Sequence, residues 1–397
     1  MRKNWVVLSL IFFILAVSLT LTAIFLYRNL PITELKVLSI KKDAQKIQME
    51  TSIGELVFSL PAEFSIELFA KNLPGARIIA QDALGNFWIS QPSEGAVSLV
   101  EVKNGKAINI NRVFTKLNNP HGLAIDPQDG ALLYIAETNK ISRVKLDSEE
   151  ASLEKIIDLP TGGRHFTRTI AFGPDDRLYV SIGSSCDVCI EEDEHRAAIY
   201  SMERDGSDFK KLADGLRNAV FFTWSEVDSK MWATEMGRDF LGDDFPSDEI
   251  NIIEEGKFYG WPWCYGKNIP DTKFDILNKA QQICSEAEAS FIDIQAHSAP
   301  LGLAFIPEEG WPEEYWYDLL VAYHGSWNRT EPTGYKIVRF KFNAKGNLEG
   351  SEDFITGWIS GEEILGRPVG ILVKPGGIMY ITDDKAGAVY RVMYSSQ

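Results

Sequence analysis

The histidines are the first candidates for a catalytic role in this chain, because they are few and can transfer protons near neutral pH. The 397 residues contain only five histidines, which are His121, His165, His195, His297 and His324. Histidine changes its charge near neutral pH and can act as a general base. A single loop histidine is more often structural than catalytic. His165 stands out because it directly precedes an apolar segment, in Gly162-Gly-Arg-His-Phe-Thr-Arg-Thr-Ile-Ala-Phe.

Arginines accompany the histidines in a chain that carries more acids than bases. Six of them lie in loops between apolar segments, namely Arg164, Arg168, Arg217, Arg238, Arg329 and Arg367. The planar fork of donors on a guanidinium suits a ligand with several carboxylates. Any one of these arginines can instead pair with acidic neighbours such as Asp239. Their joint placement is what favours an anionic ligand.

The acidic loop that begins at Gly237 has the composition of a calcium-binding segment. It reads Gly237-Arg-Asp-Phe-Leu-Gly-Asp-Asp-Phe-Pro-Ser-Asp-Glu-Ile-Asn. Calcium prefers carboxylate and backbone carbonyl oxygens. The glycine and acid positions do not fit an EF-hand, so the spacing alone is a weak indication of calcium.

A repeated unit must position these loops. Each copy is a short apolar strand, a turn rich in Asp, Pro and Gly, and a second, aromatic strand. The clearest copies begin at Gly122 and Thr169, and further copies begin near Arg77, Ala219, Gly302 and Pro368. The early units are spaced by roughly 40 to 50 residues, as the blades of a propeller are, and the six units together predict a six-bladed β-propeller, in which strand-entry loops converge on a central channel.

The segment at Phe64 precedes the first copy. We expect it to complete the last blade and close the ring, and the longer gaps between later copies to be loop insertions. A solenoid of similar units is the alternative.

The amino-terminal end predicts a membrane anchor. No charged residue occurs from Trp5 to Tyr27, and 23 helical residues span roughly 34 Å, enough to cross a bilayer core. Arg2 and Lys3 should keep residues 1–4 in the cytoplasm, with the propeller on the periplasmic or extracellular side. A cleaved signal peptide is the alternative.

The rest of the chain divides into two expected regions, and its composition argues against nucleic acid as a partner. Residues 28–60 are expected to form a stalk, and residues 61–397 the propeller. With 45% hydrophobic and 24% charged residues the chain is globular, and its net charge of −16 argues against nucleic acid as a partner.

The four cysteines are expected to form disulfides outside the cytoplasm. Sequence allows three pairings, of which Cys186 with Cys189 and Cys264 with Cys284 is favoured. A zinc site would need two closely spaced pairs, and a thioredoxin-like site would need the Cys-x-x-Cys segment to open a helix. Both alternatives are weaker.

Several motifs in order resemble a known enzyme family. They are His165-Phe-Thr-Arg-Thr, Gly173-Pro-Asp-Asp-Arg-Leu-Tyr-Val-Ser-Ile-Gly, Cys186-Asp-Val-Cys, Gly215-Leu-Arg-Asn, Asp248-Glu-Ile-Asn with Tyr259-Gly-Trp-Pro, His324-Gly-Ser-Trp-Asn-Arg and Gly366-Arg-Pro-Val. Over about residues 61 to 395 the chain resembles the sorbosone and pyranose dehydrogenases that use pyrroloquinoline quinone (PQQ), relatives of the soluble quinoprotein glucose dehydrogenases.

The resemblance implies a chemistry. A histidine at the position of His165 takes the hydroxyl proton of a sugar's reducing carbon while hydride passes to the quinone. Calcium, held partly by backbone carbonyls at Gly237 and Arg238, polarises the quinone carbonyl. Other residues are expected to bind the cofactor, and these are Arg168, Arg217, Asn218, Arg329 and Arg367.

The chain departs from the glucose dehydrogenase pattern at three places. That branch has an acidic residue where this chain has Arg164, and a proline where it has Arg238. Its cofactor-binding lysine has no counterpart near Ser326, although Arg329 is close. A degenerate cofactor site is therefore an open alternative.

The leading functional prediction is a membrane-anchored PQQ-dependent dehydrogenase of a sugar or sugar-derived aldehyde, which passes electrons to an outside acceptor such as a quinone or cytochrome. A calcium-dependent lactonase-type hydrolase is the second hypothesis, but the loop arginines argue against it. A non-catalytic binding scaffold is the third.

Overall fold

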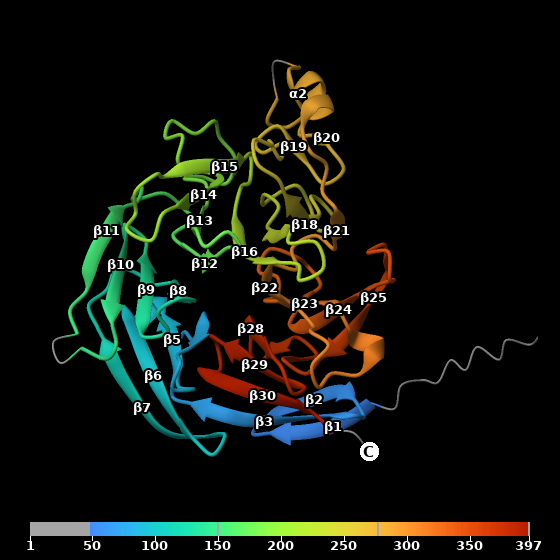
Figure 1. Cartoon of the computed structure of the whole chain (residues 1–397). Helices are drawn as coiled ribbons and strands as arrows, with labels where there is room; N and C mark the ends of the chain where they lie inside the picture. Colours follow the sequence, from blue (N-terminus) through green and yellow to red (C-terminus); the bar gives the residue numbers. More distant parts are fainter. Residues whose placement is uncertain (1–47, 149–150, 276–277, 396–397) are drawn as a thin grey trace, which may run out of the picture. The chain divides into compact units, whose positions relative to one another are not determined.

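The structure, a computed structural model, describes residues 48–148, 151–275 and 278–395. Six four-stranded antiparallel sheets follow one another round a ring (Figure 1). The predicted six-bladed β-propeller is thus confirmed. Each repeat unit read from the sequence supplies the first two strands of one blade.

The blades take their strands in chain order, with one exception in the last blade. The first three blades are β4 (Ile79–Gln81), β5 (Phe87–Gln91), β6 (Ala96–Lys103) and β7 (Lys106–Phe114); β8 (Gly122–Ile125), β9 (Leu132–Glu137), β10 (Lys140–Lys145) and β11 (Glu154–Asp158); and β12 (Ile170–Phe172), β13 (Leu178–Ile182), β14 (Ala198–Met202) and β15 (Lys210–Asp214). The other three are β16 (Ala219–Trp224), β17 (Met231–Glu235), β18 (Asp248–Ile253) and β21 (Ile292–Ile294); β22 (Pro300–Phe305), β23 (Leu319–Tyr323), β24 (Lys336–Phe342) and β25 (Leu348–Ile355); and β28 (Pro368–Lys374), β29 (Ile378–Asp383), β30 (Ala388–Tyr394) and β3 (Phe64–Lys71).

Burial differs between the middle and the edge of a blade. Every residue of β13 and β17 is buried, because neighbouring blades cover both faces of the sheet. The outermost strand β7 is mostly exposed. The inner strands β8 and β22 each contain a glycine, and a Cβ on Gly122 or Gly302 would lie 2.4 Å from a carbonyl oxygen of the next blade. The backbones approach too closely there for any side chain.

The ring closes as the sequence predicted. β3 pairs antiparallel with β30, with Phe64 opposite Tyr394 and Lys71 opposite Ala388. Figure 1 shows β3, from the start of the propeller, beside the carboxyl-terminal β30. The two ends of the domain are therefore held together in one sheet, so that no inner sheet face is left open.

The last residues of the predicted stalk are folded against the propeller. Residues 48–61 form a hairpin of β1 (Gln48–Ile53) and β2 (Leu56–Pro61). Ser59 exchanges two backbone hydrogen bonds of 3.0 Å with Thr356, and the buried Phe58 ring packs against Trp358. The alternation of apolar residues along β2 buries one face of the hairpin. The rest of the stalk and the anchor at 5–27 lie outside the described residues.

One long insertion extends from the fourth blade, between β18 and β21. It contains β19 (Cys264–Tyr265), β20 (Ile269–Pro270) and α2 (Ala280–Glu286), which Figure 1 shows at the rim of the ring. Three small elements lie in other loops: the hairpin of β26 (Ile359–Ser360) and β27 (Glu363–Ile364), and the 3-10 turns η1 (Pro92–Glu94) and η2 (Glu313–Tyr315). The longer repeat spacing is therefore an insertion and not an extra blade.

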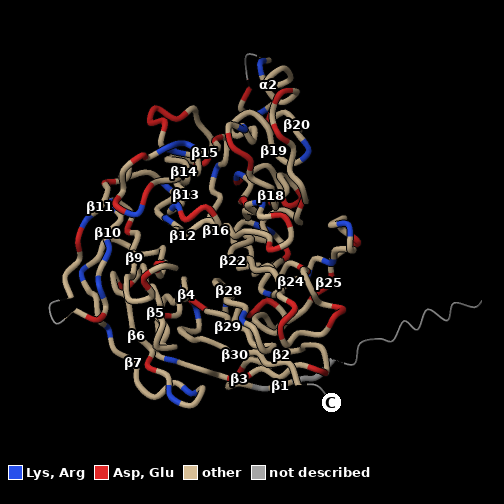
Figure 2. Tube along the Cα trace, in the orientation of Figure 1, with Lys and Arg blue, Asp and Glu red and all other residues tan. Residues whose placement is uncertain are grey.

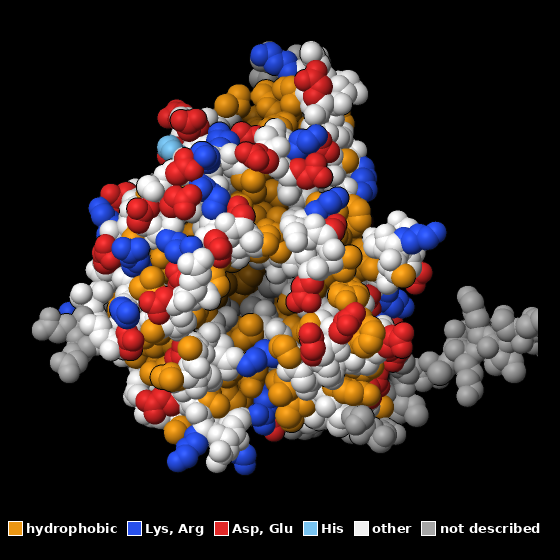
Figure 3. Space-filling view, viewed as in Figure 1, with side chains coloured by type: hydrophobic (Ala, Val, Ile, Leu, Met, Phe, Trp, Pro, Cys, Tyr) orange, Lys and Arg blue, Asp and Glu red, His pale blue; other side chains and the backbone are white. Residues whose placement is uncertain are grey.

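Both predicted disulfides are present. Cys186 is bonded to Cys189, and Cys264 is bonded to Cys284. Acidic and basic residues are interspersed along the strands and loops (Figure 2), and the face in Figure 3 is hollowed near its centre. Within the described ranges, no helix has the length and apolar character to cross a membrane.

Candidate functional site

A pocket forms where the loops that flank the inner strands converge. Its cavity has a volume of about 330 Å³, within the roughly 300–1,000 Å³ typical of small-molecule sites. Its polar lining comes from the third to sixth blades and from the start of the first. The lining residues include Arg77, Arg164, His165, Arg217, Asn218, Gly237, Asp239, Asp248, His297, His324, Asn328 and Arg367.

The hydrogen bonds of His165 fix which nitrogen carries its proton. Nδ1 lies 3.1 Å from the Ser184 carbonyl oxygen and 2.9 Å from Ser184 Oγ. The Ser184 hydroxyl donates its own proton to the Cys186 carbonyl at 2.6 Å, so both atoms facing Nδ1 are acceptors. We therefore assign the proton to Nδ1 and the lone pair to Nε2. Nε2 makes no hydrogen bond to another described residue.

His165 is neutral at physiological pH. Its burial, together with the guanidinium groups of Arg217 and Arg164, lowers its pKa to about 3. A neutral imidazole with a free Nε2 is the state that can accept a proton from a substrate.

His324 also lines the pocket, but both of its ring nitrogens are engaged. Nε2 lies 3.0 Å from Asp384 Oδ2 and Nδ1 lies 3.4 Å from an Arg367 nitrogen. Arg77 donates to the same Asp384 carboxylate at 2.9 Å. His324 therefore links Asp384 to Arg367 and has no free lone pair for a substrate.

The other three histidines differ in their access to the pocket. His297 lines it, with Nε2 2.8 Å from the Gly242 carbonyl oxygen. His121 is fully buried and does not belong to the lining, and its Nδ1 lies 3.3 Å from Thr169 Oγ1. His195 is half-buried, and its Nδ1 lies near a carboxylate two residues away.

Arg217 and Asn218 both reach the pocket, as predicted. Arg217 is held rigidly: it donates to the Asp187 carbonyl at 2.9 Å, to Asp187 Oδ1 at 2.7 Å and to the Met236 carbonyl at 3.1 Å. Gly183 makes room for the neighbouring side chains, since a Cβ there would lie 2.6 Å from Asn218 Oδ1 and 2.7 Å from His165 Cβ.

Arg367 lines the pocket from the loop before the sixth blade. Its guanidinium donates to the Gly325 carbonyl at 3.0 Å and lies over the Tyr335 ring, 5.1 Å from the centroid. Its backbone N–H donates to Asp383 Oδ1 at 2.9 Å. The loop and the side chain are thus both anchored.

Arg168 does not reach the pocket, contrary to its predicted role in cofactor binding. Its side chain is completely buried and donates to the carbonyls of Thr167 at 2.7 Å, Pro160 at 2.9 Å and His165 at 3.1 Å. Buried backbone carbonyls require donors, and this guanidinium satisfies three of them. Arg168 thus supports the loop that carries His165.

Arg329 is also absent from the pocket lining. It donates to the Asp243 carbonyl and, at 3.1 Å, to Asp244 Oδ1. The acidic loop that follows Gly237 holds this side chain away from the cavity, so in this structure Arg329 does not share the pocket with Arg217 and Arg367.

The calcium prediction concerned backbone atoms at Gly237 and Arg238. Gly237 lines the pocket, and its N–H donates to the buried Asp248 at 2.9 Å. The Arg238 side chain points elsewhere and pairs with Asp271 at 2.7 Å. Among the described residues, neither carbonyl oxygen accepts a hydrogen bond, so both remain available to an oxygen-seeking cation.

Sequence reasoning missed Arg77 and Asp384 as residues of the site. It also did not identify Asp187 and Asp239 as the carboxylates that pair with Arg217. Arg77 lies two residues before an inner strand, as Arg217 does, so its place in the repeat could have identified it. Asp239 has no such signal: it joins Arg164, Arg217 and Asn328, and these residues are brought together only by the fold.

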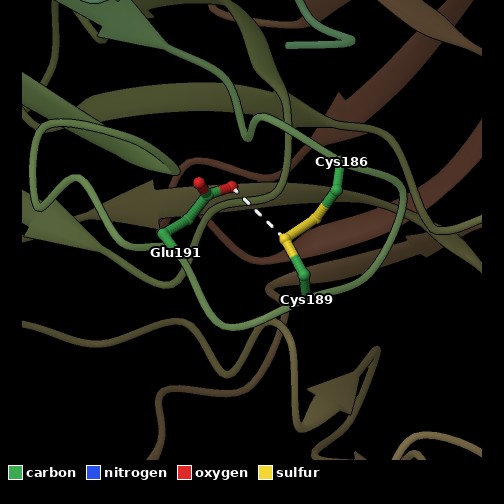
Figure 4. A group of neighbouring side chains, drawn as sticks. All are labelled: Cys186, Cys189 and Glu191. Atoms are coloured by element: carbon green, nitrogen blue, oxygen red, sulfur yellow. Dashed lines mark hydrogen bonds between the residues drawn. A yellow bond between two sulfur atoms is a disulfide. The ribbon is translucent and has the colours of Figure 1, made fainter.

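The Cys186–Cys189 loop borders the site. Both sulfurs and a Glu191 oxygen lie within 4.8 Å of one another. Figure 4 shows the Glu191 carboxylate directed toward the disulfide. The sulfurs are joined as a disulfide and offer no thiolate to a metal. The loop instead has a structural role, because Asp187 within it holds Arg217.

The profile of the TrAA12-like family matches residues 58–395. The chain belongs to this family. It is also 32% identical over 354 residues to an uncharacterized protein of Borreliella burgdorferi, covering 84% of this chain and 90% of that protein. The family is the one that the sequence motifs indicated, the PQQ-dependent pyranose dehydrogenases.

Solved structures share the propeller of this TrAA12-like chain. The PQQ domain of pyranose dehydrogenase from Coprinopsis cinerea, in its holo form, has a TM-score of 0.72 at 19% identity and covers 86% of this chain and 98% of its own. A calcium structure of the Trichoderma reesei enzyme of carbohydrate-active family AA12 has a TM-score of 0.74 at 18% identity, with 87% and 99% covered. At these identities the likeness concerns the fold.

Proposed function

We propose that this chain is a quinoprotein dehydrogenase that oxidises an aldose or a sugar-derived aldehyde, with PQQ as cofactor and His165 as general base. The observation that carries the proposal is the free Nε2 of a neutral His165 in a pocket lined by four arginines. Membership of the TrAA12-like family supports the reaction type.

The residues of the pocket fit the cofactor. PQQ carries three carboxylates, and guanidinium groups are the donors best suited to them. Arg217, Asn218 and Arg367 would hold it, joined by Arg77, whose Nε is buried without a partner among the described residues. When bound, PQQ supplies the acceptor for the two electrons and the hydrogen removed from the sugar carbon.

The chain's own residues then perform the proton chemistry. His165 takes the hydroxyl proton of the reducing carbon at Nε2, while Ser184 holds Nδ1–H and so keeps the ring in the receptive tautomer. The carbonyls of Gly237 and Arg238 would hold calcium, which would supply a Lewis acid for the reaction. Electrons leave to an acceptor outside the chain.

The lactonase-type alternative gains no support from the pocket. Its carboxylates are already engaged: Asp248 accepts backbone N–H groups from Gly237 and Ala299, and Asp239 pairs with arginines. No ring of free carboxylates is left to surround a central metal among the described residues.

A titration tests the proposed function. The purified full-length chain, in detergent and with calcium, is mixed with PQQ and followed by absorbance, and then assayed for aldose-dependent dye reduction. Saturable PQQ binding with aldose-dependent turnover is expected. A chain that binds no PQQ, or binds it without reducing dye for any aldose or sugar aldehyde tested, would refute the proposal and favour a binding scaffold.

We also propose that the uncharged segment 5–27 anchors the chain, with the propeller outside the cytoplasm. The two disulfides support this location, because such bonds persist in oxidising compartments. Protease added to intact cells should cleave the propeller. Cleavage only after permeabilisation would contradict the proposed topology.

A further inference from the structure

Exposed aromatic side chains gather at the mouth of the pocket. The described residues include five large aromatic side chains with substantial exposure, and these are Phe166, Phe240, Phe245, Phe291 and Trp327. Phe166 and Trp327 line the pocket itself. Scattered exposed apolar residues are ordinary, but a group at the rim of a cavity marks a binding surface.

Three of these rings form what we call the aromatic rim: Trp327, Phe166 and Phe240. Trp327 is 63% exposed, Phe240 67% and Phe166 41%. The Phe240 ring stands edge-on to Trp327, with centroids 5.8 Å apart and an interplanar angle of 88°. The Arg164 guanidinium lies 5.9 Å from the centroid of the Trp327 ring.

The residues on both sides of Trp327 hold it in this exposed position. Ser326 is buried, and its N–H donates to the Thr333 carbonyl at 2.9 Å. Asn328 donates from Nδ2 to Asp239 Oδ1 at 3.0 Å. The indole therefore stays in water although the loop that carries it is anchored, which indicates a ligand that covers it.

The surroundings of the rim specify the chemistry of that ligand. Arg164 and Asn328 line the pocket next to the rings and offer polar groups. The charge of Arg164 is already paired with Asp239, so the rim has no strong demand for a charged partner. A sugar ring fits this combination, because its C–H faces are apolar and its edge carries hydroxyl groups.

The order of residues along the pocket places a sugar ring bound at the aromatic rim further toward solvent than the sugar that reacts at His165. His165 and Phe166 are neighbours in the chain, with Cα atoms about 3.8 Å apart. His165 belongs to the inner part of the site, and Trp327 and Phe240 belong to the solvent side.

We propose that the aromatic rim binds a second sugar unit, linked to the one whose reducing carbon faces His165. The inference rests on the proposed function and deepens it: the substrate class is a disaccharide or longer reducing oligosaccharide. Monosaccharides occupy only the inner part of the site.

Binding to the PQQ-free, full-length protein tests the rim separately from catalysis. Cellobiose, maltose and lactose are compared with glucose and galactose by calorimetry and by tryptophan fluorescence. We expect at least one disaccharide to bind about tenfold more tightly than either monosaccharide. Trp327→Ala should remove most of that difference, and Trp327→Phe should keep most of it, since a ring is retained.

Phe291→Ala is the matched control, because Phe291 is exposed but packs against Trp232, away from the pocket. It should leave the disaccharide preference unchanged. Equal affinities for all five sugars in the wild type, no measurable sugar binding, or an unchanged preference in Trp327→Ala would overturn the proposal.

PQQ titration of the same preparations separates the two proposals. If the chain takes up no PQQ but binds disaccharides in a way that depends on Trp327, the dehydrogenase proposal is refuted and the aromatic-rim proposal stands. If PQQ uptake and aldose turnover are normal but Trp327→Ala does not change the disaccharide preference, the dehydrogenase proposal stands and the aromatic-rim proposal is refuted.

Discussion

Two of the histidines that line the pocket, His165 and His324, lie in walls that use similar residues in different arrangements. The His165 wall contains Arg217 and Asp187, and the His324 wall contains Arg367 and Asp384. In the His165 wall the carboxylate of Asp187 binds the arginine, and the histidine meets only Ser184. In the His324 wall the carboxylate binds the histidine directly.

The position of the carboxylate thus separates a reactive histidine from a supporting one. Asp384 fills Nε2 of His324, and Arg367 faces its Nδ1. His165 keeps Nε2 free. Two histidines in one cavity can therefore have different roles without any difference in residue type, because their hydrogen-bond partners decide which nitrogen is available.

Replacing His165 should have the largest effect on the reaction. In His165→Ala we expect turnover to fall by about 10² to 10⁴-fold, the usual contribution of a general base, while PQQ affinity changes little. Dye-reduction kinetics at saturating PQQ measure the first effect, and the absorbance titration measures the second.

His324→Ala is the comparison for this experiment. It leaves the His165 wall intact, so turnover at saturating PQQ should fall less than tenfold, with PQQ affinity as the main loss because Arg367 loses a neighbour. Full activity in His165→Ala, or a larger turnover loss in His324→Ala, would reverse the assignment of the base.

Removing the Arg217 guanidinium should weaken cofactor binding. In Arg217→Gln we expect the Kd for PQQ to rise about tenfold to hundredfold, as for one lost charge-assisted contact. The unfolding temperature should fall too, because Asp187 and Asp239 each lose one of their ion-pair partners. Arg329→Gln is the matched control outside the pocket, and an equal loss of affinity there would restore Arg329 as a cofactor residue.

Removing the Cys186–Cys189 disulfide, next to the His165 wall, should weaken PQQ binding less than Arg217→Gln does. Replacing Cys186 and Cys189 by serine frees the loop that carries Asp187, and we expect the Kd for PQQ to rise roughly fivefold. The same change at Cys264 and Cys284 should lower the unfolding temperature and spare PQQ affinity, since that bond lies in the insertion. Equal effects on PQQ affinity would show that loop rigidity beside Arg217 is unimportant.

The smallest expected effect is on the pH dependence of stability. The folded pKa of His165 is about 3, below the usual 6.5 of an unfolded chain. Between these values the unfolded chain binds the extra proton, so this residue makes stability rise with pH. Relative to His165→Gln, the PQQ-free wild type should therefore gain unfolding temperature from pH 4 to pH 7. A difference that does not change with pH would contradict the neutral imidazole.

Local patterns in the sequence determined the propeller and part of the site. Strand alternation and Asp-Pro-Gly turns depend on residues close in the chain, so the six units, the role of Phe64 in ring closure and both disulfides could be predicted. The loop position of His165, Arg217 and Arg367 before inner strands also placed them at the pocket.

Only the tertiary structure decided where the long polar side chains point. Arg168 precedes an inner strand as the pocket arginines do, and Arg329 lies in the same loop as the pocket residue Asn328, but Arg168 turns to buried carbonyls and Arg329 to Asp244. These partners are chosen by backbone groups and charges that become neighbours on folding. Asp239 lies 75 residues along the chain from its partner Arg164. The free Nε2 of His165 likewise depends on Ser184, which lies two strands further along the chain, in the loop after β13.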